Sequence, residues 1–408
     1  MRFHLPWNLA FSRMVGGPHP LVVSYATNCK DHSFDHVAAM EQSPPSAVRR
    51  GTQRVASYLR SRARGLPSRQ SWRLARQVDF AEIEAMDQAL PEDAILFVHT
   101  APLYFGKRPY IFHFESFQTL FTPLLFTGQT RGVDLKKHGY HAHLLAELGS
   151  SRCLAIFSHI EHSTEILREV MGDSVARKVH YVPLAFQLDN TDWFPQKYET
   201  PGVEILFTNS FHNNPSSFYL RGGHFVLRAV ESLRAQGADV SLTVLSSKPP
   251  EFADRPYSET SQGIRWIDRR VDDGELDALY RQAKIFASPS AGLHSYGLVR
   301  AVAHGCVPLV SDALGYDEFL GKDKFTAGRV EGVFDTVYRR EDAGWYSDDY
   351  STFRTADAQL AAATLGEIER LLATDLGQLA ACNRERMARA FAHDAQRRRF
   401  NRMVEDMR

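Results

Sequence analysis

The chain has 408 residues, of which 44% are hydrophobic and 24% are charged. This apolar content suffices for two hydrophobic cores, because a single core stops growing at roughly 250–300 residues. Lysine plus arginine and aspartate plus glutamate each total 48, which argues against a protein that coats nucleic acid or membranes through its net charge. The cysteines are far apart without a CxxC pair, and no apolar run reaches transmembrane or signal-peptide length. We therefore expect a soluble, cytoplasmic protein without a disulfide framework or a zinc ribbon.

Short apolar runs alternate with helix-length amphipathic segments, which is typical of α/β proteins with parallel sheets. In the first half this pattern predicts strands at 21–25, 94–99, 110–113, 154–158 and 179–183. It predicts helices at 47–64, 140–148 and 163–171, the last with Ser163 at its N-cap. Residues 189–202 have no periodicity and contain Asn, Asp, Pro, Thr and Gly, which indicates a linker.

The second half repeats the pattern, with strands predicted at 204–208, 241–246, 263–267, 285–288 and 307–311. Helices are predicted at 223–235, 274–282, 295–304 and 356–373. We predict two doubly wound Rossmann-like domains, 1–190 and 203–383, joined by a linker at 191–202. They would face each other across a cleft, since ligands of such sheets bind beyond the carboxyl ends of the strands. The arginine-rich segment 384–408 is predicted to be a helix that either closes the second domain or returns to the first.

The most informative segment is 285–320, in which a buried strand ends at Ser288-Pro289-Ser290 and a helix starts near Ser295. A helix that starts just past a strand points its N–H groups and positive dipole end at the ligand, which favours a phosphate or diphosphate. Gly292 would let the backbone approach that anion closely, and Ser295 could cap the helix and donate to oxygen.

These residues resemble the signature of the retaining group 1 glycosyltransferases, which have the GT-B fold. The resemblance rests on SPS at 288–290, YGL at 296–298 and RAVAHG followed by CVP at 300–308. The GCVP turn is also similar to exostosin-type glycosyltransferases. Further landmarks follow in the family's order over about residues 94–312: YIFHFESFQTLF, KVHYVPLAF, Arg221-Gly222 and LYRQAKIFASPS. Residues before Ala94 match poorly.

The resemblance implies that the first domain binds a glycan or lipid-linked acceptor and that the second binds a nucleoside-diphosphate sugar. It also implies retention of anomeric configuration, with neither a metal nor a cofactor. The family has two glutamates beside the donor, and here Arg300 stands at the second position and Gly292 or His294 at the first. Arg300 could meet a phosphate or a different base, or mark a site that no longer turns over.

Arg221 is the leading candidate for the donor phosphate, because a guanidinium binds phosphate in a bidentate manner; the alternative is a solvated arginine. The full set of candidate donor-binding residues is Asn209, Ser210, His212, Arg221, Gly222, Gly292, His294, Ser295, Tyr296, Gly297 and Arg300.

His113, the last residue of the 110–113 strand, and Glu115, two residues later, are candidate catalytic residues. The resemblance implies that His113 lies beside the reacting centre, and Glu115 could serve as a charge stabiliser or an acceptor ligand. A lone histidine at a strand end can equally be a satisfied core residue. His99 also ends a predicted strand, but no motif of the family surrounds it as one surrounds His113. Asp348-Asp349 lies in a polar stretch and is interpreted as solvated surface rather than as a metal site.

The segment Arg49–Arg76 is strongly basic: between Val48 and Val78 there are nine arginines and no acidic residue. It is either a solvated face or a membrane-surface contact, which would suit a lipid-linked acceptor and a peripheral location at the inner face of the membrane. No nucleic-acid-binding module is recognisable, so we expect no nucleic-acid partner.

The function predicted from the resemblance is sugar transfer in the assembly of cell-surface polysaccharide or lipopolysaccharide. The alternative from a different class is a non-catalytic GT-B protein that binds a nucleotide sugar or a partner, which Arg300 would favour. Exostosin-like chemistry and a GT-B-fold sugar-nucleotide epimerase are two further alternatives.

Overall fold

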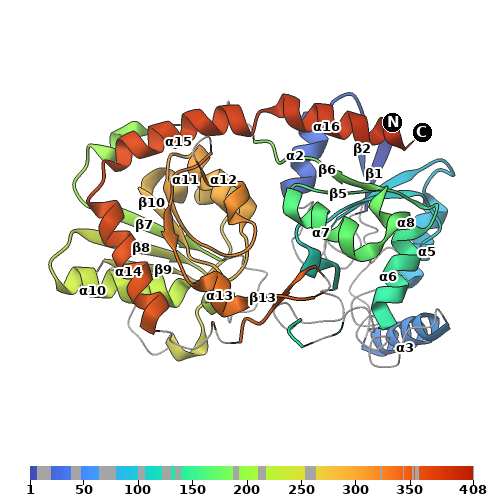
Figure 1. Cartoon of the computed structure of the whole chain (residues 1–408), viewed down its shortest axis with the longest axis horizontal. Helices are drawn as coiled ribbons and strands as arrows, with labels where there is room; N and C mark the ends of the chain where they lie inside the picture. Colours follow the sequence, from blue (N-terminus) through green and yellow to red (C-terminus); the bar gives the residue numbers. More distant parts are fainter. Residues whose placement is uncertain are drawn as a thin grey trace. The chain divides into compact units, whose positions relative to one another are not determined.

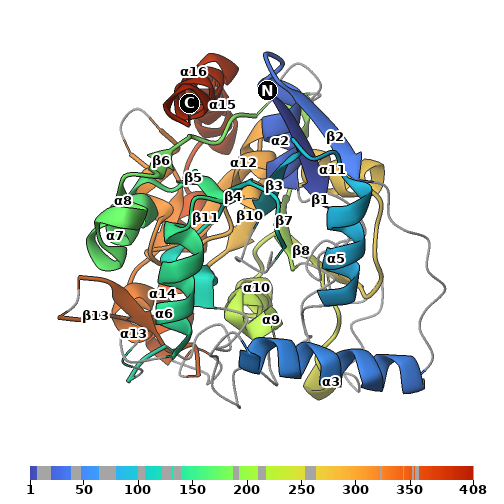
Figure 2. The same ribbon diagram turned by 90° about the vertical axis from the view of Figure 1, so that its right-hand side faces the viewer.

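The computed structural model describes residues 1–6, 20–37, 47–63, 80–99, 106–121, 130–132, 134, 139–186, 193–209, 217–252, 263–321, 324–342, 344–351, 353 and 358–407. The chain forms two compact units. The first contains Met1–Ala185, Arg340–Ser347 and His393–Arg408, and the second contains Phe186–Arg339 and Asp348–Ala392. Each unit holds one six-stranded sheet with helices on both faces (Figure 1 and Figure 2), so the predicted α/β class with two Rossmann-like sheets is confirmed.

In the first unit all neighbouring strands are parallel, in the order β2-β1-β3-β4-β5-β6. The strands are β1 (Arg2–Pro6), β2 (Ser33–Val37), β3 (Ile95–His99), β4 (Tyr110–His113), β5 (Cys153–Ser158) and β6 (Val179–Tyr181). The helices are α2 (Pro20–Asn28), α3 (Ala47–Ala63), α5 (Phe80–Ala89), η1 (Phe117–Phe121), α6 (Gly139–Gly149), α7 (Glu161–Met171), α8 (Asp173–Ala176) and α16 (His393–Asp406). Every residue of β4 is buried, as expected for a parallel strand covered on both faces.

Two predictions for the first unit are wrong. Residues 21–25 are not a strand but part of α2, because their apolar residues serve a helix: Leu21, Val22, Tyr25 and Cys29 are all buried at helical spacing. The first strand is instead β1 at the start of the chain. Ser163 is not an N-cap, since α7 begins at Glu161 after Ile160.

In the second unit the sheet order is β12-β11-β10-β7-β8-β9, which is the Rossmann order read from the other edge. Its strands are β7 (Val203–Thr208), β8 (Val240–Leu245), β9 (Ile264–Ile267), β10 (Ile285–Ser288), β11 (Val307–Ser311) and β12 (Gly328–Val330). Its helices are η2 (Pro195–Tyr198), α9 (Ser217–Leu220), α10 (Gly223–Ala235), η3 (Pro250–Phe252), α11 (Asp273–Gln282), α12 (Ser295–Ala303), η4 (Tyr316–Glu318), α13 (Val333–Val337), α14 (Ala358–Leu372) and α15 (Leu376–Ala390). Two short strands, β13 (Tyr338–Arg340) and β14 (Tyr346–Asp348), complete the list.

The C-terminal segment 384–408 is not one helix. It comprises the end of α15 and the whole of α16, separated by Phe391 and Ala392. Phe391 stacks on Phe319 and Phe325 within the second unit, and this packing fixes the break. Phe400 of α16 belongs to the core of the first unit. Within the described residues, no helix combines the length and the apolar character needed to cross a membrane.

Acidification is expected to destabilise the second unit through His224 of α10, whose pKa is lowered to about 3 by burial and, secondly, by the charge of Arg228. Neither ring nitrogen of His224 has a hydrogen-bond partner among the described residues, so the folded state holds the neutral ring. The unfolded chain takes up a proton near pH ~6.5. Because the unfolded state then binds more protons, the free energy of unfolding falls as the pH drops from about 6.5 towards 3, by roughly 3 kcal/mol at pH ~4.5.

Urea unfolding of the wild type and of His224→Phe at pH ~7.5 and ~4.5 measures this effect. The variant is expected to lose less stability on acidification than the wild type, whatever its stability at neutral pH. The same loss in both proteins would contradict the assignment.

Candidate functional site

The carboxyl end of β10 in the second unit leads through a short loop into α12, which begins at Ser295 as predicted. The N-cap residue is His294, whose side chain makes no capping hydrogen bond, and the first turn holds no acidic residue. The expectation that Ser295 caps the helix is wrong, because Ser295 is its first helical residue. The positive end of the helix dipole is therefore not offset by a carboxylate of its own first turn.

The guanidinium of Arg221 is held against this loop. Its Nη1 donates to Ser290 Oγ and to the carbonyl oxygens of Gly292 and Leu293, each at 3.3 Å. Ser290 Oγ itself donates to the Gly292 carbonyl at 2.6 Å. All these acceptors are uncharged, so within the described part of the chain the guanidinium is oriented but its charge is not neutralised. Such a cation can bind a phosphate or a carboxylate in a bidentate manner.

Gly222 makes the close approach of the Arg221 turn to this loop possible. It has φ +75°, a conformation that favours glycine, and a methyl group there would overlap the carbonyl oxygen of Pro289. Gly297 in α12 is also required by packing, since a methyl group there would lie 2.7 Å from the His294 ring. Tyr296 is largely buried, and burial raises the pKa of its hydroxyl.

Two tyrosines that the sequence pattern did not indicate, Tyr338 and Tyr350, pack against the loop between β10 and α12. Tyr338 Oη donates to the Ala291 carbonyl at 2.7 Å, and burial raises the pKa of this hydroxyl. Tyr350 lies beside Gly292, where a methyl group would come within 3.1 Å of its hydroxyl. Asp348 is fully buried, so its interpretation as solvated surface is wrong. Nothing in the sequence pattern links residues 338–350 to a loop about fifty positions earlier.

Arg300 takes part in a different set of contacts. It lies on the face of α12 that meets α11, where it forms ion pairs with Asp277 at 2.7 Å and Asp273 at 3.1 Å. His304 Nε2 lies 2.8 Å from the same Asp277 carboxylate. These contacts explain why an arginine is tolerated at this position, and its role in donor binding stays a prediction.

Asn209 follows β7, and its amide donates to Ser246 Oγ at 3.3 Å. Ser246 follows β8, the parallel neighbour of β7, so both side chains lie at the carboxyl edge of the sheet. Sequence reasoning missed Ser246, although it ends a predicted strand. The two remaining candidates, Ser210 and His212, lie outside the described residues.

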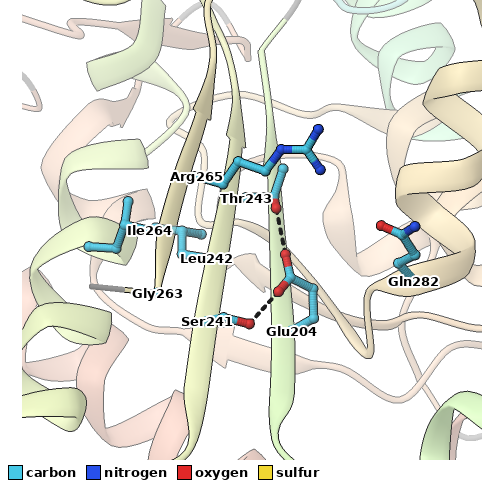
Figure 3. Close-up of a pocket in the computed structure, with 8 residues that line it drawn as sticks. All are labelled: Glu204, Ser241, Leu242, Thr243, Gly263, Ile264, Arg265 and Gln282. Carbon is cyan, nitrogen blue, oxygen red and sulfur yellow. Dashed lines mark hydrogen bonds between the residues drawn. The ribbon is translucent and has the colours of Figure 1, made fainter. Parts of the chain in front are cut away.

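A polar pocket of about 320 Å³ lies at the other end of these strands (Figure 3). In it the Glu204 carboxylate accepts hydrogen bonds from Ser241 and Thr243. Glu204, Ser241 and Arg265 each stand second in their strand, so this pocket opens near the amino ends of β7, β8 and β9. It contains none of the predicted donor-binding residues.

Of the two candidate catalytic residues in the first unit, His113 is the middle member of a row of three histidines and Glu115 lies at one end of that row. His99 Nδ1 is 2.7 Å from His113 Nδ1, and His113 Nε2 is 3.1 Å from His159 Nδ1. His159 Nε2 lies 4.0 Å from a carboxylate oxygen of Glu115. His113 is 0% exposed, so its side chain does not touch solvent or a ligand directly. Sequence reasoning missed His159, although it directly follows a predicted strand as His113 ends one.

The comparisons with known proteins concern the fold and the domain at residues 204–339. A family model described as "Glycosyl transferases group 1" matches residues 204–339. The α,α-trehalose-phosphate synthase (UDP-forming) of Burkholderia xenovorans is 14% identical, with a TM-score of 0.57, over 100% of this chain and 98% of that one. A structure of that enzyme in complex with glucose-6-phosphate is 13% identical, with a TM-score of 0.56 and 100% coverage of both chains.

The catalytic domain of starch synthase IV from Arabidopsis thaliana, bound to ADP and acarbose, is also similar. It is 11% identical, with a TM-score of 0.52, and the match covers 83% of this chain and 78% of that one. No curated protein matches this chain by sequence. At these identities the solved structures show a shared GT-B fold, and the family model identifies a glycosyltransferase domain.

Proposed function

We propose that this chain, a GT-B glycosyltransferase whose residues 204–339 form a group 1 domain, transfers a sugar from a nucleoside-diphosphate sugar to a glycan or lipid-linked acceptor. The observation that carries the proposal is the Arg221 guanidinium, oriented by three uncharged oxygens beside the N-terminus of α12. A cation and a helix N-terminus together suit a diphosphate.

Cleavage of the sugar–diphosphate bond leaves negative charge on the departing diphosphate. Arg221 and the first N–H groups of α12 stabilise this charge, and because both are fixed before the reaction, they need no reorganisation at the transition state. We propose that this positive charge replaces a metal and that the anomeric configuration is retained. The expected setting is the assembly of cell-surface polysaccharide or lipopolysaccharide.

A thermal-shift screen tests the donor site, with UDP-, GDP-, ADP- and CMP-sugars each measured with Mg²⁺ and with EDTA. A ligand at ~100 times its Kd stabilises the folded protein by about 2.7 kcal/mol. We expect one nucleotide class to raise the melting temperature equally in both conditions. No shift with any donor would overturn the proposal. A shift without transfer or hydrolysis would favour the non-catalytic nucleotide-sugar-binding protein.

For the acceptor side we propose contact with an anionic membrane surface through α3, which covers the first part of the basic segment Arg49–Arg76. The residues after 63 in that segment lie outside the described ones. Val55 and Leu59 stand one turn apart and are 49% and 59% exposed, and Arg54 and Arg62 are exposed on the same helix. Exposed apolar residues flanked by arginines suit the interface of a membrane that carries negative lipids.

Replacing Leu59 by glutamate is expected to weaken binding to vesicles of phosphatidylcholine and phosphatidylserine by about tenfold or more, since it removes apolar contact and adds a repelled charge. Sedimentation with the vesicles measures the bound fraction. Val23→Glu is the matched control, because Val23 is also an exposed apolar helix residue, at 40%, but lies on α2. Equal binding by both variants, or by the wild type to phosphatidylcholine alone, would contradict the membrane contact.

A further inference from the structure

The sheet of the first unit brings the three histidines together. His99 ends β3 and His113 ends β4, and they are direct register partners in that parallel pair. His159 follows β5, the next strand. Neighbouring strands lie about 4.8 Å apart, and the rings accordingly stack, with centroids 4.8 and 5.3 Å apart and interplanar angles of 16°. Strand register therefore explains the His99–His113 pair, and His159 joins the row from two residues past Phe157, the register partner of His113.

The surroundings of the row are apolar. The central ring, His113, lies 5.0 Å from Phe157 and 5.4 Å from Tyr25, centroid to centroid. His159 is 3% exposed, whereas the Glu115 side chain is 36% exposed. Ser158 Oγ donates to the Glu115 carbonyl at 3.0 Å and so fixes the backbone of this residue. Hydrogen bonds between rings in such a setting are stronger than in water, and Glu115 is the member of the row that a substrate can reach.

A neutral imidazole has one N–H and one acceptor nitrogen. The hydrogen bonds along the row can therefore all run in one of two directions, from His99 towards Glu115 or the reverse. In the first, His99 Nδ1–H donates to His113, His113 Nε2–H donates to His159, and His159 Nε2–H points at Glu115. In the second every bond is reversed, and the lone pair of His159 Nε2 faces the Glu115 carboxylate. At 4.0 Å the contact is electrostatic rather than a hydrogen bond, and an ionised carboxylate favours the first direction.

We propose that Glu115 sets the direction of this histidine row, and that the row in turn orients Glu115 to accept a hydrogen bond from a hydroxyl group of the acceptor. His99, His113 and His159 are then positioning residues, and Glu115 is the group that touches the substrate. The assignment to an acceptor hydroxyl rests on the proposed function, whereas the direction of the row does not. The ligand class is a hydroxyl-bearing molecule such as a sugar.

The direction of the row has a spectroscopic signature that is independent of activity. In ¹⁵N-histidine NMR spectra of the full chain at pH ~8, where an ordinary imidazole is neutral, we expect His99 in the Nδ1–H tautomer and His113 and His159 in the Nε2–H tautomer. In Glu115→Ala the preference is lost, and the signals of His99 and His159 move towards the other tautomer. His162→Gln, which removes a half-exposed histidine of α7 close to Glu165, leaves them in place.

The opposite tautomers in the wild type, or unchanged tautomers in Glu115→Ala, would overturn the proposed direction. The kinetic part is tested by acceptor titration. Glu115→Ala is expected to lower kcat/KM for the acceptor by ~10- to 100-fold with an unchanged KM for the donor, and His159→Phe is expected to lower it in the same way. An unchanged acceptor kcat/KM in Glu115→Ala would overturn the role of Glu115. A wild type that transfers no sugar but shows the predicted tautomers would contradict the proposed function and leave the direction of the row standing.

Discussion

Replacing Arg221 by methionine is expected to lower kcat/KM for sugar transfer by about 10²- to 10³-fold, the usual effect of removing one preorganised donor to a developing anion. Methionine matches the aliphatic part of the arginine side chain, so that part of the packing is kept while the charge and the three hydrogen bonds to Ser290, Gly292 and Leu293 are lost. The N-terminus of α12 is unaffected. We therefore expect weaker donor binding and slower turnover rather than complete loss of both, as measured by initial rates over a series of donor concentrations.

Two variants separate charge from geometry. Arg221→Lys keeps the charge but cannot contact several oxygens in the arginine plane, so an intermediate loss is expected. Arg228→Met removes an exposed arginine of the following helix, α10, and should leave the rate unchanged. If Arg221→Met and Arg228→Met were equally active, the assignment of Arg221 to the diphosphate would be wrong.

Most strands and helices predicted for the second unit match the structure because these elements carry local signals, whereas β12, α13 and the first part of α15 were not predicted. Strands β10 and β11 are buried at every position, so each appears as an uninterrupted apolar run. Helix α10 follows Gly222, and α11 begins after Asp272, whose side chain caps it. These signals require no knowledge of distant residues.

The fold of the first unit is harder to predict from sequence because its core depends on residues far apart in the chain. Tyr25 of α2 packs against Phe157 and Phe400, and no local pattern connects these three positions. The run Leu-Val-Val-Ser-Tyr is apolar and β-branched, which favours a strand by propensity, but its burial at helical spacing against α16 selects a helix. Tertiary packing overrides propensity here.

The residues of the candidate site also divide into those with local sequence signals and those that depend on distant contacts. Arg221, Gly292 and the start of α12 belong to recognisable motifs, and the structure brings them together. Tyr338 supports that loop from a distant part of the chain, and no sequence motif indicates this contact. His159 lies between these cases, since a histidine directly after a buried strand is a usable signal once the strand order is known. Strand order is what the sequence pattern leaves open.

Replacing Gly222 by alanine is expected to lower the free energy of unfolding of the second unit by roughly 2–5 kcal/mol. The φ of +75° costs an alanine about 1–2 kcal/mol. The added methyl group would overlap the Pro289 carbonyl oxygen, and forcing the two apart in a packed site costs about 1–3 kcal/mol more. The displaced atoms belong to the loop that orients Arg221, so donor binding should fall with stability. Urea unfolding and the donor thermal shift measure the two effects.

Gly237→Ala isolates the steric contribution. Gly237 has a similar φ of +85° in the same unit, but a methyl group there meets no atom within 4 Å. It should therefore show only the backbone cost of about 1–2 kcal/mol and no change in donor binding. The difference between the two losses in free energy of unfolding measures the cost of moving the Arg221 turn away from the Pro289 loop. Equal losses of stability and unchanged donor binding in both would mean that this contact is not what holds the phosphate site together.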